Sequence, residues 1–157
     1  MLENKNIILT GAGRGIGKDI AKYCNLKGAN IALIARTESE LIHTLDSIQD
    51  SSNSSYFVCD IKDQPTVNHV VNKILKYFNY KIDVLINNAG IILPIGKFID
   101  TDLTHWVNNL QTNLIGNVYL TQLVLPVMVK KKYGKIINLS GGGSVYARPN
   151  FSAYSVS

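Results

Sequence analysis

The 157-residue sequence predicts an α/β fold in which helices cover both faces of a doubly wound parallel sheet. Two observations support this prediction. Short apolar runs typical of buried strands alternate along the whole chain with longer segments whose apolar residues recur at helical spacing. The first run leads directly into a glycine-rich turn and a helical pattern, which is how such sheets begin. Because no repeat or linker divides the chain, we expect one domain over residues 1–157.

The individual elements follow from local patterns. The expected strands are residues 7–9, 31–35, 56–59, 84–86 and 135–139. Thr37 and Glu40 have the spacing of a capping box, which predicts a helix start. Asp63 is expected to cap the next helix, whose apolar residues recur in steps of three and one. A long helix is expected over residues 102–131, broken or bent near Pro126. A further helix could begin within residues 151–157.

Composition excludes several classes of protein. A hydrophobic content of 46% and a charged content of 17% indicate a globular chain rather than a disordered one. The net charge of +5 is spread out and accompanies no base-reading motif, so we expect no nucleic-acid partner. No apolar run approaches the roughly 18 residues of a membrane span, and no signal peptide is expected. Cys24 and Cys59 are interpreted as reduced thiols of a cytoplasmic protein. Metal-ligand spacing is absent among the histidines, which are His43, His69 and His105.

The stretch Thr10–Gly17, which reads T-G-A-G-R-G-I-G, is the strongest local signal. Gly11 and Gly15 let the backbone turn tightly and approach a ligand, because they carry no Cβ. Gly17 lets the following helix pack close to the sheet. The free N–H groups and positive dipole end of that helix favour a pyrophosphate group. The turn therefore predicts a dinucleotide site.

The other unusual residues of the chain follow the predicted strands directly. They are Ala35-Arg36, Cys59-Asp60, Asn87–Gly90 and Ser140. In a parallel sheet the carboxyl ends of the strands share one edge, and ligands bind beyond that edge. The sequence therefore predicts a single site there.

Arg36 indicates which dinucleotide is bound. An acidic residue after the second strand would bind the ribose hydroxyls of NAD, whereas an arginine suits the 2′-phosphate of NADP. Arg14 in the glycine turn is a candidate second cation for that phosphate. Glu38 is a rival acidic candidate, although its place at a helix start explains it otherwise. NADP is the predicted cofactor and NAD is less favoured.

The chain resembles the short-chain dehydrogenase/reductase family, whose doubly wound sheet is a Rossmann fold. The family's T-G-x-x-x-G-x-G motif is Thr10–Gly17, and its N-N-A-G motif is Asn87–Gly90. Its adenine-contacting aspartate corresponds to Asp60, its helix asparagine to Asn113 and its tyrosine to Tyr154. The resemblance implies a cofactor site formed by Thr10, Gly11, Arg14, Gly15, Ile16, Gly17, Arg36, Asp60, Ile61, Asn88, Ala89 and Gly90.

The resemblance also implies the chemistry, which is hydride transfer between nicotinamide and a carbonyl or alcohol carbon. Tyr154 would be the general acid or base, Ser140 would hold the substrate oxygen, and Asn113 would help hold a proton-relay water. The partners implied are a small carbonyl or alcohol substrate and, as in related enzymes, further copies of the same chain.

The sequence departs from the family pattern at two points, and both concern the predicted catalytic residues. The family serine lies thirteen residues before the tyrosine, where this chain has Gly141, so the serine is Ser140 or, less favoured, Ser144. The family lysine, four residues after the tyrosine, and the family's last strands and helices fall beyond Ser157. We therefore expect an amino-terminal portion of a reductase with little activity of its own. The alternatives are a catalytically inactive dinucleotide-binding fragment and an interaction protein that reuses the fold. The substrate cannot be inferred from these residues.

Overall fold

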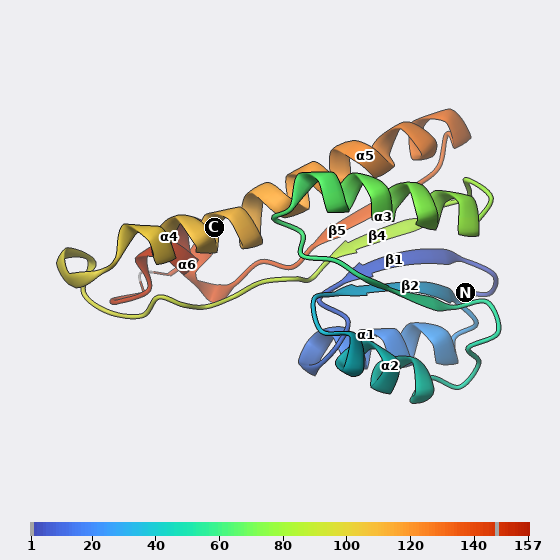
Figure 1. Ribbon diagram of the computed structural model, residues 1–157, viewed down its shortest axis with the longest axis horizontal. Coiled ribbons are helices and arrows are strands. Elements are labelled where there is room, and N and C mark those ends of the chain that lie inside the picture. The colour runs from blue at the N-terminus through green and yellow to red at the C-terminus, as the bar shows by residue number, and fades with distance from the viewer. Residues whose placement is uncertain (1, 147) are drawn as a thin grey trace.

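The computed structural model describes residues 2–146 and 148–157. Within them, five parallel strands form one sheet in the order β3-β2-β1-β4-β5, as Figure 1 shows. The strands are β1 (Asn6–Thr10), β2 (Asn30–Ala35), β3 (Ser55–Val58), β4 (Val84–Asn87) and β5 (Lys135–Asn138). This confirms the predicted doubly wound sheet, with strand bounds within one or two residues of those expected.

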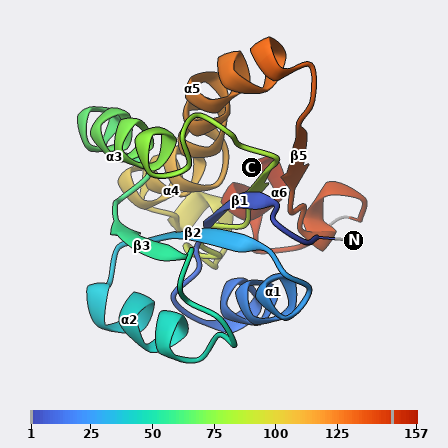
Figure 2. The same cartoon turned by 90° about the vertical axis from the view of Figure 1, so that its right-hand side faces the viewer.

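Helices cover both faces of the sheet, with α1 and α2 on one side and α3 and α5 on the other (Figure 2). The helices are α1 (Gly15–Leu26), α2 (Glu38–Asp46), α3 (Gln64–Tyr77), α4 (Leu103–Leu110), α5 (Gly116–Lys131) and α6 (Ser152–Val156). The first four strands are each joined to the next by a helix or a helix-bearing crossover, which is the connection that a parallel pair requires.

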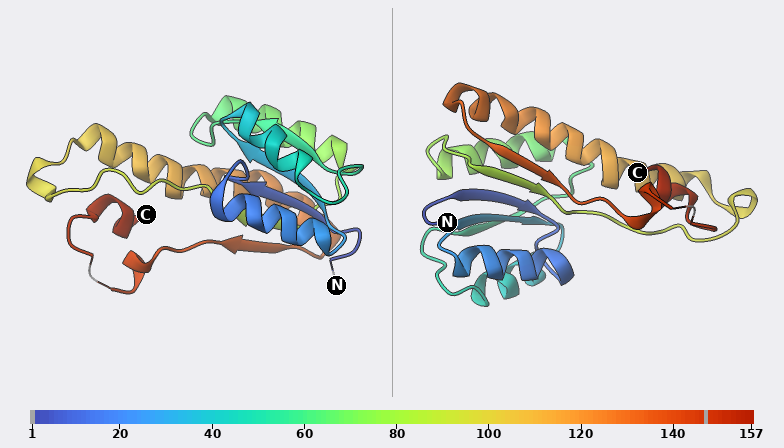
Figure 3. Two further views of the ribbon diagram at one scale, coloured as in Figure 1. Left: turned by 90° about the horizontal axis from the view of Figure 1, so that it is seen from below. Right: turned by 180° about the vertical axis from the view of Figure 1, so that it is seen from behind.

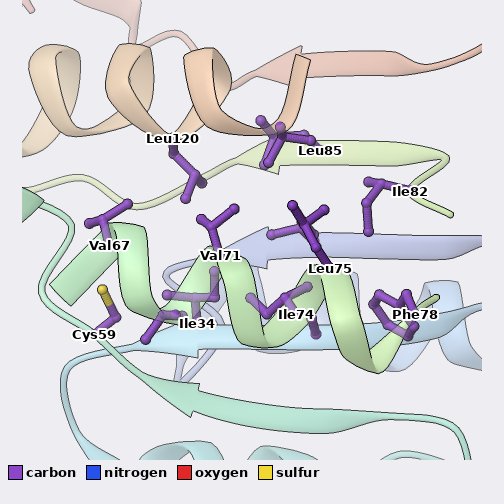
Figure 4. Close-up of a cluster of buried hydrophobic side chains, with 14 of the residues drawn as sticks. Ile34, Cys59, Val67, Val71, Ile74, Leu75, Phe78, Ile82, Leu85 and Leu120 are labelled. Carbon is purple, nitrogen blue, oxygen red and sulfur yellow. The ribbon is translucent and has the colours of Figure 1, made fainter. Parts of the chain in front are cut away.

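The two layers of helices produce two hydrophobic clusters. Ile8 faces α3 and α5, whereas its neighbours Ile7 and Leu9 face α1 and α2, and all three are at most 1% exposed. Figure 4 shows the first cluster, in which α3 places Val71 and Ile74 against the sheet. Because the central strands are buried on both faces, their sequences are continuously apolar.

The long helix expected over residues 102–131 is interrupted, but the interruption is not at Pro126. α5 runs through Pro126 to Lys131, and the irregular turn is a π-helical segment, Gln111–Ile115, between α4 and α5. Proline removes one backbone donor, yet the flanking turns are held against the sheet by Val124 and Met128, which are buried. The helix is therefore not broken at Pro126.

The helical segment Leu103–Lys131 spans 29 residues and contains an 18-residue window with a mean hydropathy of 1.3. By length and composition alone it is long and apolar enough to cross a membrane, contrary to the sequence-based expectation. This is weak evidence of a membrane span, because a core helix of a soluble protein meets the same criterion. In this structure 28% of that window is buried.

α4 and α6 lie beyond the end of the sheet and give the molecule an elongated shape (Figures 1 and 3). There α6, the helix expected near residues 151–157, lies beside α4, where the Trp106 indole N–H donates to Ser152 Oγ at 3.2 Å. β5 forms one edge of the sheet and is mostly exposed.

Candidate active site

The glycine turn has a geometry that other residues would not tolerate. Gly11 and Gly15 have φ angles of +64° and +52°, in the left-handed region that favours glycine. A Cβ at Gly17 would lie 2.1 Å from the Gly11 carbonyl oxygen, so α1 can pack this close only with glycine there. A Cβ at Gly15 would meet no atom within 4 Å, because that position opens outward. The turn is thus closely packed on its inner side and open on its outer side.

Hydrogen bonds made by Thr10 and Asn88 connect this turn to the residues that follow β4. Thr10 Oγ1 accepts hydrogen bonds from the backbone N–H groups of Asn88 and Ala89, both at 3.0 Å. The Asn88 side-chain amide donates to the carbonyl oxygens of Thr10 and Gly11, at 2.9 and 3.2 Å. Thr10 is fully buried, so its hydroxyl positions the turn and does not face a ligand.

A cavity of about 320 Å³ lies over the carboxyl ends of the strands. Ten of the twelve residues predicted to bind a cofactor line it, and the two that do not are Thr10 and Gly15. The ten are Gly11, Arg14, Ile16, Gly17, Arg36, Asp60, Ile61, Asn88, Ala89 and Gly90. At its edge, the first turn of α1 has no side-chain cap, which leaves backbone N–H groups for an anion. This cradle fits the pyrophosphate of a dinucleotide.

At the charged end of the cavity, Thr37 and Glu40 do not make the hydrogen bonds of the predicted capping box. The Thr37 side chain makes no capping hydrogen bond to α2. Glu40 instead faces the glycine turn, where its Oε1 lies 3.4 Å from Arg14 Nη1. The capping-box prediction is therefore wrong, because an ion pair and contact with the turn take the Glu40 carboxylate. Arg36, Arg14 and Glu40 all line the cavity.

Asp60 and Ile61 form the loop after β3. Asp60 Oδ1 accepts from the Lys62 backbone N–H at 3.1 Å, and Lys62 Nζ lies 3.7 Å from Asp60 Oδ2. Ile61 is buried, and its carbonyl oxygen would lie 2.7 Å from a Cβ at Gly116. The loop is thereby fixed between the cavity and the start of α5.

Asn113, in the π-helical segment, binds the loop after β4. Its Oδ1 accepts from the Ile91 N–H at 2.7 Å, and its Nδ2 donates to the Ile91 carbonyl at 2.9 Å. The same amide reaches Ser157 Oγ at 2.9 Å and Asn109 Oδ1 at 3.0 Å. Asn109 is fully buried and also donates to the carbonyls of Ile91 and Leu93. Asn109 carries no signal in the sequence, because its burial depends on segments that are distant along the chain.

Tyr154 lies against the loop that follows β5. A Cβ at Gly141 would fall 2.5 Å from the Tyr154 hydroxyl oxygen, which places that hydroxyl directly over the loop. Ser140 Oγ donates to Ser144 Oγ at 2.9 Å, and Ser144 Oγ donates to the Gly141 carbonyl at 2.8 Å. Both candidate serines therefore share one short hydrogen-bonded chain, beside the residue that Tyr154 contacts.

Cys59 also lines the cavity but is poorly suited to nucleophilic chemistry. Burial, together with the smaller effect of the Asp60 and Asp63 charges, raises the pKa of its thiol to about 11. The thiolate is the reactive form of cysteine. Near neutral pH the Cys59 thiol is therefore protonated and acts as part of the cavity wall.

The glycine turn, the Asn88 side chain that supports it and the cavity above them together define a dinucleotide-binding α/β protein. More particularly, the chain belongs to the short-chain dehydrogenase family, whose model matches residues 5–157. A fatty acyl-CoA reductase from Acinetobacter baylyi is 35% identical over 98% of the chain, and an NADP-dependent 3-hydroxy acid dehydrogenase from Schizosaccharomyces pombe is 36% identical over 92%. An NAD⁺-bound xylitol dehydrogenase structure matches 99% of the chain with a TM-score of 0.93 and 28% identity.

The chain is shorter than these relatives. It spans 52% of the fatty acyl-CoA reductase, 60% of the 3-hydroxy acid dehydrogenase and 60% of the xylitol dehydrogenase chain. The similarity thus concerns about half the length of the curated relatives.

Proposed function

We propose that the protein is an NADP-dependent oxidoreductase that transfers hydride between the nicotinamide and a small carbonyl or alcohol substrate. The choice of NADP over NAD rests on the position of Arg36, which follows β2 and lines the same cavity as the glycine turn. A guanidinium at this place suits the 2′-phosphate that distinguishes NADP from NAD. The name of the S. pombe relative is consistent with this choice.

The bound nicotinamide would supply or accept the hydride. The chain's own residues would orient the reactants and move the proton. In the proposed reduction, the Tyr154 hydroxyl gives its proton to the substrate oxygen, which Ser140 or Ser144 holds by a hydrogen bond. A neighbouring cation would favour the ionised form of such a tyrosine and so help the proton transfer near neutral pH. Asn113 holds the loop after β4, and in the proposal it also helps to place a proton-relay water.

Titration of the protein with NADPH and NADH tests this proposal. We expect tighter binding of NADPH, and we expect Arg36→Asp to reverse the preference because a carboxylate repels the phosphate and accepts from ribose hydroxyls. Equal affinity of the unmodified protein for both cofactors would contradict the cofactor choice. Binding of NADPH without reduction of any carbonyl in a broad panel would support an inactive dinucleotide-binding protein instead.

A further inference from the structure

We propose that Glu40 sets how strongly the protein discriminates between phosphorylated and unphosphorylated cofactors. In this proposal its carboxylate competes with the 2′-phosphate for Arg14. The inference rests on the proposed NADP site, because it concerns the charge that opposes the phosphate there. It differs from the cofactor choice itself, which depends on Arg36.

Arg14 and Glu40 lie side by side in the lining of the cavity. Glu40 Oε1 lies 3.4 Å from Arg14 Nη1, and the two side chains are 33% and 81% exposed respectively. Arg14 is thus free to turn toward a ligand, whereas Glu40 is held more firmly. An anion arriving at Arg14 meets a guanidinium that already has a partner.

Contacts with the glycine turn keep Glu40 in this position. A Cβ at Gly13 would lie 2.9 Å from Glu40 Cβ and 3.0 Å from its Oε2, so the glutamate is packed on the glycine turn. One turn further along α2, the Thr44 hydroxyl donates to the Gly13 carbonyl at 3.1 Å. These contacts pack α2 against the turn and keep Glu40 beside Arg14.

The charges that line the cavity favour an effect on the phosphorylated cofactor alone. The charged side chains that line the described cavity are Arg14, Arg36, Glu40 and Asp60, and Asp60 lies beside Lys62 at the end of a different strand. A 2′-phosphate near the two arginines would therefore meet one opposing carboxylate, that of Glu40. The ribose of NAD carries an uncharged hydroxyl at the same position, so its binding leaves the Arg14–Glu40 pair intact. Glu40 should thus weaken binding of the phosphorylated cofactor selectively.

Glu38 provides a matched control on the same helix. It has the same side chain and lies two residues earlier in α2, but its Oε1 accepts from the Tyr56 hydroxyl at 3.0 Å. It does not line the cavity. Neutralising Glu38 changes the net charge by the same amount as neutralising Glu40 without releasing Arg14.

The test is calorimetric titration with adenosine 2′,5′-bisphosphate and adenosine 5′-monophosphate, which differ only in the 2′-phosphate and require no turnover. We expect Glu40→Gln to tighten binding of the bisphosphate about three- to tenfold, a size set by one exposed ion pair and the removed repulsion. Binding of the monophosphate should change less than about twofold, as should both affinities in Glu38→Gln. In an Arg14→Ala background the gain from Glu40→Gln should shrink, because the pair no longer exists.

The outcomes separate this inference from the proposed function. If the unmodified protein prefers the bisphosphate and Glu40→Gln does not increase that preference, the inference is wrong and the proposed cofactor choice stands. If Glu38→Gln gives the same gain as Glu40→Gln, the effect is one of net charge and the inference is also wrong. If the unmodified protein shows no preference and Glu40→Gln creates one, Glu40 is the discriminating residue and the proposed NADP preference fails.

Discussion

Gly141 lies directly beneath the Tyr154 hydroxyl, and a Cβ at residue 141 would approach the hydroxyl oxygen to 2.5 Å. Residue 141 is also the position at which the short-chain dehydrogenase pattern has its serine. With Tyr154 where it is, a serine side chain does not fit there. The hydroxyl that holds the substrate in the proposed reaction must then come from Ser140 or Ser144, which are hydrogen-bonded to each other at 2.9 Å.

Gly141→Ala is therefore expected to displace the Tyr154 ring and α6 with it. Overpacking of this kind costs about 1–3 kcal/mol, and a misplaced hydroxyl would slow any reduction about 100-fold or more. Thermal unfolding and carbonyl reduction with NADPH measure the two effects. Gly142→Ala is the control, because a Cβ there would meet no atom within 4 Å. Equal effects of the two variants would contradict the contact with Tyr154.

Thr10→Val tests whether the buried hydroxyl supports the glycine turn. The change preserves shape but leaves the N–H groups of Asn88 and Ala89 without the acceptor they use at 3.0 Å. Each unpaired buried donor costs about 1–3 kcal/mol. Denaturant unfolding should show that loss, with weaker dinucleotide binding. Thr10→Ser keeps the oxygen and should retain binding, so loss of binding in both variants would argue against the role of the hydroxyl.

The sheet could be predicted from the sequence because its strands are buried on both faces. Ile31–Ala35 is uniformly apolar for that reason, and the glycine turn is recognisable since Gly11 and Gly17 each meet a steric limit. The carboxyl ends of parallel strands share one edge by geometry. The cavity beyond the carboxyl ends of the strands was therefore predictable from local patterns and their order along the chain.

The remaining features depend on contacts between distant segments. Thr37 and Glu40 have the spacing of a capping box, but Arg14 in another loop takes the carboxylate. Asn109 is an ordinary polar residue in a helical pattern, and its burial appears only when α6 and the Ile91 loop pack against α4. Pro126 is tolerated because buried neighbours hold the flanking turns. Sequence spacing carries no information on such partners.

Gly15→Val is expected to remove dinucleotide binding while the sheet remains folded. The residue has a φ of +52°, which strains a β-branched side chain, yet a Cβ would point into open space. The strain is about 1–2 kcal/mol. Gly15 does not line the cavity, so binding would be lost because the valine methyl groups project outward at the amino end of α1, where the pyrophosphate would approach the free N–H groups. Titration with NADPH and circular dichroism separate binding from folding. Gly17→Ala should instead unfold the turn, because its Cβ would meet the Gly11 carbonyl oxygen at 2.1 Å. A folded Gly15→Val protein that binds NADPH normally would show that the turn has only a structural role.

The ionised side chain of Asp83 is expected to stabilise the folded protein near neutral pH, and this contribution is expected to be lost in acid. The residue is 4% exposed, and its carboxylate accepts from Lys131 Nζ at 2.7 Å and from the Asn6 N–H at 2.9 Å. Burial raises its pKa, but these hydrogen bonds, together with the charges of Lys131 and Lys5, lower it by more, so the pKa is below its ordinary value. A group whose folded pKa is depressed stabilises the protein fully above its unfolded pKa, about 3.9. This contribution is lost as the pH falls through the folded value.

Asp83→Asn should therefore lower the free energy of unfolding by about 1–3 kcal/mol at pH 7, less than for a fully buried pair because both lysines are about one-third exposed. The difference between variant and unmodified protein should stay constant above about pH 5 and shrink below about pH 4. Urea unfolding across this pH range measures it. Lys131→Met should remove part of the same pH dependence, whereas Asp100→Asn, at an exposed carboxylate, should leave it unchanged. A difference for Asp83→Asn that grows as the pH falls would contradict the depressed pKa, because a carboxylate of raised pKa gives the opposite sign.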